Sequence, residues 1–405
     1  MKIFCNLHPA LTLLFAIAPL VALTNSAVTA HHSKYIFFVG TYTEDGYKGK
    51  GIYAYAYDAD TGHVAPLGLA AETSNPSWIA FHPNRRFLYA TNEVGNFKGP
   101  NSGGLSVFSI DRNKDGLPTG KLTFLNEVST RGAGTCYVTI DRTGKYALVA
   151  NYDGGSVAVF PIRENGSLGD ASAFVQHAGH GADPDRQAAP HAHSINLSPD
   201  NRFAMVDDLG LDQLLVYKFD STKGLLTPNE PSHAKLDAGS GPRHFALHPS
   251  GKFAYVVSEM KGTVTVFSND ARAGTLRALQ TISTLPENFK GNIEDAEIAV
   301  HPSGKFLYVS NRGDSNSIAI FTVDPEKGTL TLVESTSTQG KNPRSFEIDP
   351  TGALLFVANQ DSNNIVMFRI DQNGGFLTKA GHLSPIGPAL DVPSPVCIKF
   401  LKIGE

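Results

Sequence analysis

Apolar and polar positions recur in the same order along most of the chain. A run of alternating, β-rich residues ends in a turn that carries Pro or Gly, and a second, strongly apolar run follows it. A third run such as GSVAVFPI and a weaker fourth run that often follows Gly complete each copy. Six copies begin at Pro76, Thr135, Ala192, Pro242, Asp295 and Pro343. Alternation bounded by turn residues predicts short strands, so each copy predicts four of them.

A seventh copy is split between the two ends of the chain. PVCIKF from Pro395 matches a first strand that lacks its second, and YIFFVGT from Tyr35 matches a second strand that lacks its first. The second residues of the seven copies are separated by 59, 57, 50, 53, 48 and 52 positions. Four strands per unit of this length are typical of a β-propeller. We therefore predict an all-β, seven-bladed β-propeller over 31–405, closed by a blade that both termini share, which removes exposed sheet edges.

The first thirty residues have a different pattern. Lys2 is followed by an apolar run over 10–23 that Pro19 interrupts, and Val28 and Ala30 provide small residues before a cleavage point. The run is too short for a spanning helix, so we predict a signal peptide at 1–30 and an exported protein, periplasmic or secreted, without a membrane partner after cleavage. An N-terminal anchor is the alternative.

Composition narrows the class further. With 39 Gly, 24 Pro and 18% charged residues among 405, long helical bundles are excluded. A net charge of −4 gives no basic footprint for nucleic acid. After loss of Cys5 only Cys136 and Cys397 remain, both in apolar runs, which predicts buried thiols and no disulfide framework. No CxxC supports a structural zinc site.

The repeat also predicts where side chains converge. In an antiparallel pair the start of the first strand lies beside the end of the second, and these positions are 16 residues apart in each of six copies. The pairs are Ser77/Glu93, Cys136/Tyr152, His193/Leu209, Arg243/Glu259, Ala296/Arg312 and Arg344/Gln360. We expect these residues to form a ring around one mouth of the central channel.

A purely structural ring would place small or apolar groups at these equivalent positions. Cys136, Leu209, Ala296 and Val396 fit that expectation. The charged and histidine members of the ring do not fit it, namely His193, Arg243, Arg344, Glu93, Glu259 and Arg312. The adjoining positions add further polar or aromatic groups, namely Trp78, Tyr137, His244 and Glu297. Such a concentration indicates a binding or catalytic site, because buried ions stabilise a fold poorly. The alternative is mutual ion pairing, for example of Arg243 with Glu259.

Other motifs are weaker. His177, His180, His191 and His193 could be assembled into a metal site, but no spacing resembles a calcium loop. The longest irregular insertion, 176–192, is expected on the same face as the ring. The chain has no GxSxG and no phosphate-binding Gly loop followed by Lys-Ser/Thr. The repeated HPSGK strings predict turns, because Pro fixes φ and Gly accepts positive φ.

Several strings together resemble one family. ADPDRQAAPHAHS ending at Ser194, GSGPRH ending at His244 and AEIAVHPSGKFLYVSNRG ending at Gly313 are similar to the seven-bladed β-propeller lactonases, which include the propeller-type 6-phosphogluconolactonases and the carboxy-cis,cis-muconate cyclases. NPRSFEIDPTG and ANQDSNNI look similar too. The resemblance implies catalytic groups at His193, Arg243, Glu259 and Arg312, with no metal and no organic cofactor. The predicted signal peptide departs from the many relatives that look cytosolic.

From the ring and the resemblance we predict a hydrolase that opens a sugar lactone, such as gluconolactone or 6-phosphogluconolactone. Arg243 and Arg312 would stabilise the oxyanion, and His193 or Glu259 would take the proton from water. The substrate hydroxyls would be bound by the other polar members of the ring, namely Glu93, His191, His244, Glu297, Arg344 and Gln360. The alternatives are a lactone-forming muconate cyclase and a secreted propeller that binds carbohydrate or protein. An edge-free ring needs no partner, so a monomer is expected.

Overall fold

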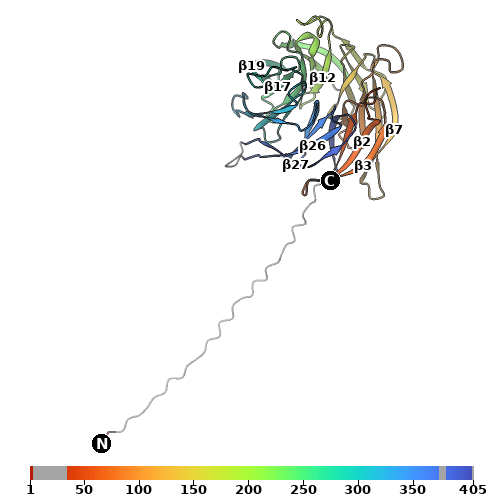
Figure 1. Ribbon diagram of the computed structural model, residues 1–405. Coiled ribbons are helices and arrows are strands. Elements are labelled where there is room, and N and C mark those ends of the chain that lie inside the picture. Colours follow the sequence, from red (N-terminus) through yellow and green to blue (C-terminus); the bar gives the residue numbers. More distant parts are fainter. Residues whose placement is uncertain (3–33, 374–379, 404–405) are drawn as a thin grey trace. The chain divides into compact units, whose positions relative to one another are not determined.

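A computed structural model describes residues 1–2, 34–373 and 380–403 of the chain (Figure 1). The predicted signal peptide, apart from Met1 and Lys2, lies outside the described residues. Contacts divide the chain into Met1–His32 and Ser33–Glu405, and the fold below is that of the second unit. None of the helices in the described ranges has the length and apolar character needed to cross a membrane.

Seven antiparallel sheets of four strands each confirm the predicted all-β, seven-bladed propeller. The closing blade consists of β28 (Pro395–Lys402), β1 (Lys34–Thr41), β2 (Gly51–Asp58) and β3 (His63–Glu72). The next three are β4 (Ile79–Phe81), β5 (Phe87–Asn92), β6 (Gly104–Arg112), β7 (Pro118–Ser129); β8 (Thr135–Ile140), β9 (Tyr146–Asn151), β10 (Ser156–Pro161), β11 (Ala173–Gln176); and β12 (Ala192–Leu197), β13 (Phe203–Asp208), β14 (Gln213–Asp220), β15 (Leu225–Lys235). The last three are β16 (Pro242–Leu247), β17 (Phe253–Ser258), β18 (Thr263–Asp270), β19 (Thr275–Ser283); β20 (Asp295–Val300), β21 (Phe306–Asn311), β22 (Ser317–Val323), β23 (Leu330–Ser337); and β24 (Pro343–Ile348), β25 (Leu354–Asn359), β26 (Asn364–Ile370), β27 (Leu383–Asp391). One short 3₁₀ helix, η1 (Leu209–Leu211), follows β13.

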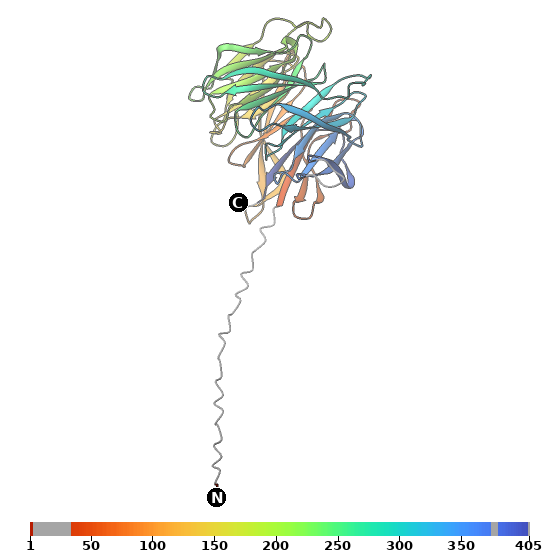
Figure 2. The same cartoon turned by 90° about the vertical axis from the view of Figure 1, so that its left-hand side faces the viewer.

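The split seventh copy closes the ring as the sequence predicts. β28 pairs antiparallel with β1, and Phe400 lies opposite Phe37. The first strands of consecutive blades contact one another all the way round, from β4 through β8, β12, β16, β20 and β24 to β28 and back to β4. In Figures 1 and 2 the blue strands of the last blade lie beside the orange strands of the closing blade. Both termini of the propeller therefore complete one sheet.

The core consists of layers between neighbouring blades. In each of the six blades that follow the closing blade, the second strand is buried along its whole length, because it faces an adjacent sheet on both sides. Between the last blade and the closing blade, Phe37 packs against Phe356 with ring centroids 5.4 Å apart. The outermost strands are largely exposed, as in β19. Cys136 and Cys397 are free and buried in the inner strands, as predicted.

The HPSGK strings form turns that also connect blades. Nε2 of His248 donates to the carbonyl of Gly304 in the turn of the next blade, at 3.0 Å, and His301 repeats this with Gly352 at 2.8 Å. Nδ1 of His248 accepts from Ser250 within its own turn. These histidines fix the spacing of the blades on the face opposite the predicted site. Their role is structural, and they lie apart from the histidines of the candidate site.

Candidate functional site

The predicted pairing of first-strand and second-strand residues, within each blade at the mouth of the channel, is present in all six unsplit copies. In each, the backbone N–H of the second-strand residue donates to the carbonyl two positions before its first-strand partner. The bonds are Glu93 to Asn75 (3.1 Å), Tyr152 to Gly134 (2.8 Å), Leu209 to His191 (2.9 Å), Glu259 to Gly241 (2.8 Å), Arg312 to Glu294 (2.8 Å) and Gln360 to Asn342 (2.9 Å). The repeat therefore brings the ring residues together through its own main chain.

A β-bulge at the start of the first strand directs the side chains. The register shifts between Pro242 and His244, and equivalent shifts occur around Cys136, His193, Ala296 and Arg344. A bulged residue is unpaired and is turned away from the regular alternation. The backbone two positions before it is tight: Gly241 has a φ of 65°, and an added Cβ would lie 2.7 Å from Sδ of Met260. Arg243 is thus aimed by local backbone geometry rather than by its neighbours alone.

Arg186, Arg243, Glu259 and Arg312 form a group that we call the arginine cluster. Oε2 of Glu259 accepts from Nε of Arg243 at 3.0 Å and forms an ion pair with Nη2 of Arg312 at 2.9 Å. Oε1 accepts from Nη2 of Arg186 at 2.6 Å. Burial alone would raise the pKa of Glu259, but Arg312 and Arg243 lower it to about 2. The carboxylate is ionised and its oxygens are occupied by guanidinium groups.

Arg243 is the innermost of these arginines. Its side chain is 2% exposed, and Nη1 donates to the carbonyl of Ala296 at 2.9 Å. Burial, followed by repulsion from Arg312 and Arg344, lowers its pKa to about 10. No group in the described part of the chain hydrogen-bonds its Nη2. The ion pair with Glu259 that the structural alternative expects is present, and one arm of the guanidinium is left for another molecule.

His193 lies beside the arginine cluster and is buried. Its ring meets Tyr152 and His244 edge-on, at centroid distances of 5.3 and 5.1 Å, and its Nδ1 lies 3.9 Å from Sγ of Cys136. Burial, and then the positive charge of Arg243, holds the pKa of His193 well below its usual value. Within the described ranges, Nε2 makes no hydrogen bond. The imidazole is neutral and can accept a proton there.

Next to the arginine cluster, His244 and Glu297 form a second pair. Nδ1 of His244 lies 3.2 Å from Oε1 of Glu297, and burial lowers the pKa of His244 to about 4 despite this carboxylate. The His244 ring contacts Trp78 and Tyr137, whose own rings stack at 4.5 Å. The stacked Trp78 and Tyr137 rings form an aromatic surface beside this pair, and the hydroxyl-binding role of His244 and Glu297 stays a prediction.

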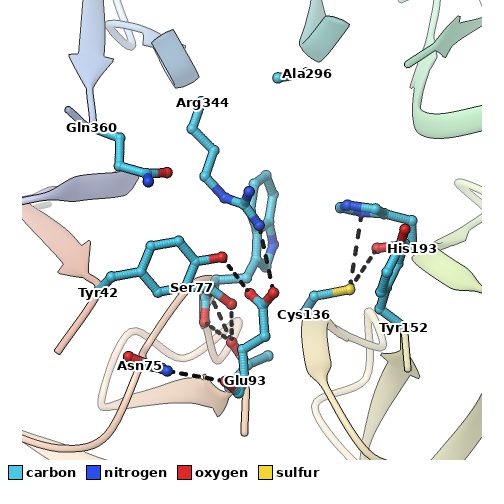
Figure 3. Close-up of polar contacts among 12 residues, drawn as sticks. Tyr42, Asn75, Ser77, Glu93, Cys136, Tyr152, His193, Ala296, Arg344 and Gln360 are labelled. Atoms are coloured by element: carbon cyan, nitrogen blue, oxygen red, sulfur yellow. Dashed lines mark hydrogen bonds and ion pairs between the residues drawn. The ribbon is translucent and has the colours of Figure 1, made fainter. Parts of the chain in front are cut away.

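On the other side of the mouth is a pocket of about 430 Å³ that we call the polar pocket. Its lining includes Tyr42, Glu44, Glu93, Asp153, Arg312, Asn342, Arg344 and Gln360. Oε2 of Glu93 accepts from the Tyr42 hydroxyl at 3.0 Å, and Oε1 lies 3.6 Å from Nη2 of Arg344. The Arg344 guanidinium lies 5.0 Å above the Tyr42 ring. In Figure 3, Arg344, Glu93 and Tyr42 face one another, and His193 points toward them from the opposite side.

The volume of the polar pocket is within the range of small-molecule sites, roughly 300–1,000 Å³. A larger pocket of about 560 Å³ lies at the outer edge of the blades, around Phe203 and Glu230, and holds none of the predicted residues. The predicted residues Glu93, Arg312, Arg344 and Gln360 line the polar pocket, whereas His193, Arg243 and Glu259 lie outside its lining.

The insertion 176–192 reaches the predicted face and is held at both ends. Nδ1 of His177 bonds Oδ2 of Asp208 at 2.6 Å, and the buried Gln187 donates to Oδ1 of Asp212 at 2.7 Å. His191 stacks on Tyr152 at 4.6 Å. Among the described residues, no three His, Cys, Asp or Glu side chains are grouped closely enough to hold a metal ion. Each of the four histidines considered for such a site contacts a different partner: Asp208, Gly181, Tyr152 and His244, respectively.

Some residues of the site were missed by sequence reasoning. Arg186 is part of the insertion and has no equivalent in other copies, so the repeat could not place it on Glu259. Tyr42 occupies the ring position of the split copy, where its backbone N–H donates to Ser394 at 3.1 Å, and Asp153 lies one position beyond Tyr152. Including the split copy in the comparison would have found Tyr42, and extending it by one residue would have found Asp153, but neither step would have found Arg186.

Comparisons with known proteins agree with the propeller fold. Residues 36–400 match the sequence model of the family described as "Lactonase, 7-bladed beta-propeller". A Bacillus subtilis protein named 6-phosphogluconolactonase is 37% identical over 369 residues, which cover 91% of this chain and 99% of the relative. A Formosa agariphila protein of the same name is 33% identical over 84% of this chain and 94% of its own. The solved structure of the periplasmic gluconolactonase of Pseudomonas aeruginosa is 35% identical, covers 92% of this chain and all of its own, and has a TM-score of 0.83.

Proposed function

The chain belongs to the family of seven-bladed β-propeller lactonases and is a lactonase, and on that premise we propose that it hydrolyses the ring ester of an aldonolactone at the mouth of its channel. The observation that carries the proposal is a pair of atoms at the arginine cluster that make no hydrogen bond within the described chain. Nε2 of His193 can accept a proton and Nη2 of Arg243 can donate a hydrogen bond, and neither has a partner in the described chain. Ester hydrolysis needs one group of each kind.

In the proposed first step, water adds to the carbonyl carbon of the lactone. The new C–O bond forms as Nε2 of His193 takes one proton from the water, and the carbonyl electron pair moves onto oxygen. Arg243 and Arg312 stabilise that oxyanion. Because their charges are already in place and largely desolvated, little reorganisation is needed when the negative charge develops.

In the second step, the tetrahedral intermediate collapses and the bond between the carbonyl carbon and the ring oxygen breaks. The proton held by His193 passes to the ring oxygen, which becomes a hydroxyl, and the product is an open hydroxy acid that ionises at neutral pH. The positive surroundings that keep His193 neutral at rest also make its protonated form a strong acid, which favours this return of the proton.

Glu259 has a positioning role in this proposal. With a pKa of about 2 and hydrogen bonds from guanidinium groups at both oxygens, it is a poor base at neutral pH. It holds Arg243 and Arg312 in a fixed orientation instead. The arginines also supply the positive charge that a metal ion would otherwise supply, so we propose that the hydrolysis is metal-independent. We also propose, from the sequence, that the enzyme is exported and is a monomer.

The test is continuous pH-stat titration of acid release by purified residues 31–405, with glucono-δ-lactone and 6-phosphoglucono-δ-lactone, with and without EDTA. Acceleration that persists in EDTA is expected. The absence of acceleration with either lactone would contradict the proposal. In that case, turnover of a 3-carboxymuconate would indicate the cyclase alternative, and saturable sugar binding without turnover would indicate a binding protein.

A further inference from the structure

We infer that the substrate is an unphosphorylated aldonolactone, and that the carboxylates of the polar pocket select it against the 6-phosphate ester. This inference rests on the proposed function, since it concerns which lactone the same site accepts. It depends on two features of the polar pocket: the balance of its charges and the kind of hydrogen-bonding atoms that it leaves unpaired.

The charge balance of the polar pocket is unfavourable for a dianion. Three carboxylates, Glu44, Glu93 and Asp153, line it against two guanidinium groups. Glu44 and Asp153 are exposed, and neither forms an ion pair with any residue that the structure describes. A phosphate monoester carries a charge of about −1.5 to −2 at neutral pH. Bound here, it would face uncompensated negative charge instead of an excess of positive charge.

Both guanidinium groups of the polar pocket already have anionic partners. Nη2 of Arg344 lies 3.6 Å from Glu93, and Nη2 of Arg312 lies 2.9 Å from Glu259. Arg186, the most exposed arginine at the mouth, is held by Glu259 at 2.6 Å and does not line the polar pocket. A phosphate would therefore have to displace an existing ion pair to gain an arginine.

The unpaired atoms in the lining also favour a polyol. Oε1 of Gln360 and Oδ1 of Asn342 are buried without a hydrogen-bond partner in the described chain. Both are acceptors, and the cost of leaving them unpaired is removed only by a donor. Nε2 of Gln360 is already directed to Asp361 at 3.2 Å, which fixes the orientation of the amide. The 6-hydroxyl of the neutral lactone can donate to these atoms, whereas the phosphate dianion that replaces it in the 6-phosphate ester has no hydrogen to donate.

The experiment compares kcat/KM for glucono-δ-lactone and 6-phosphoglucono-δ-lactone with the same preparation of residues 31–405, each corrected for spontaneous opening. We expect the neutral lactone to be preferred by at least about tenfold, as for two like-charge contacts near a surface. Preference for the phosphorylated lactone, or equal use of both, would overturn the inference and leave the proposed function standing. Failure to hydrolyse either would instead contradict the proposed function.

A charge-neutralised variant, Glu44→Gln with Asp153→Asn, tests whether these carboxylates cause the selection. We expect kcat/KM for the phosphorylated lactone to rise by about fivefold or more relative to the neutral one, because two negative charges have been removed. The matched control is Glu164→Gln with Asp170→Asn, exposed positions in the connection that follows β10 on the opposite face. An unchanged ratio in the first variant, or the same change in the control, would overturn the assignment to the polar pocket.

Discussion

The two sides of the propeller mouth carry similar residue types in different states. In the arginine cluster, the Arg243 and Glu259 side chains are 2% and 9% exposed, and the carboxylate forms ion pairs with three guanidinium groups. In the polar pocket, the Arg344 and Glu93 side chains are 16% and 20% exposed and lie 3.6 Å apart, beyond hydrogen-bonding distance. One side is desolvated and fixed, and the other is open to solvent.

We infer from this difference that the two sides of the mouth have different roles in the reaction. A fixed, desolvated charge contributes most to a transition state, because its orientation costs nothing when charge develops. A solvated and loosely paired charge can exchange its partner for a substrate group, which contributes to binding in the ground state as well. We therefore expect changes in the arginine cluster to lower kcat and changes in the polar pocket to raise KM.

The largest expected effect is that of Arg243→Ala on turnover. Loss of one oxyanion donor lowers kcat by about 10²–10³-fold. Glu259 keeps its bonds from Arg312 and Arg186, so the fold should persist, which thermal unfolding followed by circular dichroism would verify. His193→Ala should have a comparable effect through loss of the base. Normal lactone turnover by both variants would refute the site assignment.

Glu259→Gln should affect stability as well as rate. Removing the shared carboxylate leaves buried arginines without compensation, and breaking a buried ion pair costs about 3–5 kcal/mol. We expect the free energy of unfolding, from urea titration, to fall by that order. Glu259→Asp, which keeps the charge, is the control. A variant that is as stable as the parent would mean that the cluster is not electrostatically coupled.

Arg344→Ala should separate the two sides of the mouth most clearly. We expect KM to rise by about tenfold, the effect of one lost interaction with a charged donor, while kcat changes little. Steady-state kinetics with the neutral lactone measures both constants. A fall in kcat with unchanged KM would place Arg344 with the arginine cluster instead.

Arg186→Ala should have a smaller effect. Its side chain is 42% exposed, and solvent-exposed ion pairs contribute about 0–1 kcal/mol. We expect a two- to fivefold loss in kcat/KM that becomes smaller in high salt. Arg202→Ala, which removes an exposed ion pair with Asp200 away from the mouth, is the matched control. A loss as large as that of Arg243→Ala would show that the insertion belongs to the fixed side.

The smallest expected change is that of activity with pH. The pKa of His193 is depressed, so its neutral, active form persists below the usual value of about 6.5. We expect kcat/KM to change less than twofold between pH 8 and pH 6. A histidine with the usual pKa would lose about three-quarters of its neutral form over that range. An inflection near pH 6.5 would contradict the buried, cation-flanked environment of His193.

The architecture and half of the site can be predicted from the amino-acid sequence alone. Alternation, turn residues and the spacing of copies are local properties, so they predicted the four-stranded unit, the split blade and the paired positions 16 residues apart. The β-bulge repeats with the unit, and so Arg243 and Glu259 meet through hydrogen bonds of their own blade. A repeated backbone places equivalent residues in equivalent positions whatever their side chains.

The charge states and the partners of those side chains depend on how the blades are arranged in space. Arg186 reaches Glu259 across 73 residues from an insertion without a counterpart in other copies. The neutral state of His193 depends on burial and on cations from other blades. The unpaired acceptors of Gln360 and Asn342 also become visible only once the polar pocket is assembled. Desolvation and long-range charge depend on distances between blades, and no local pattern in the sequence encodes those distances.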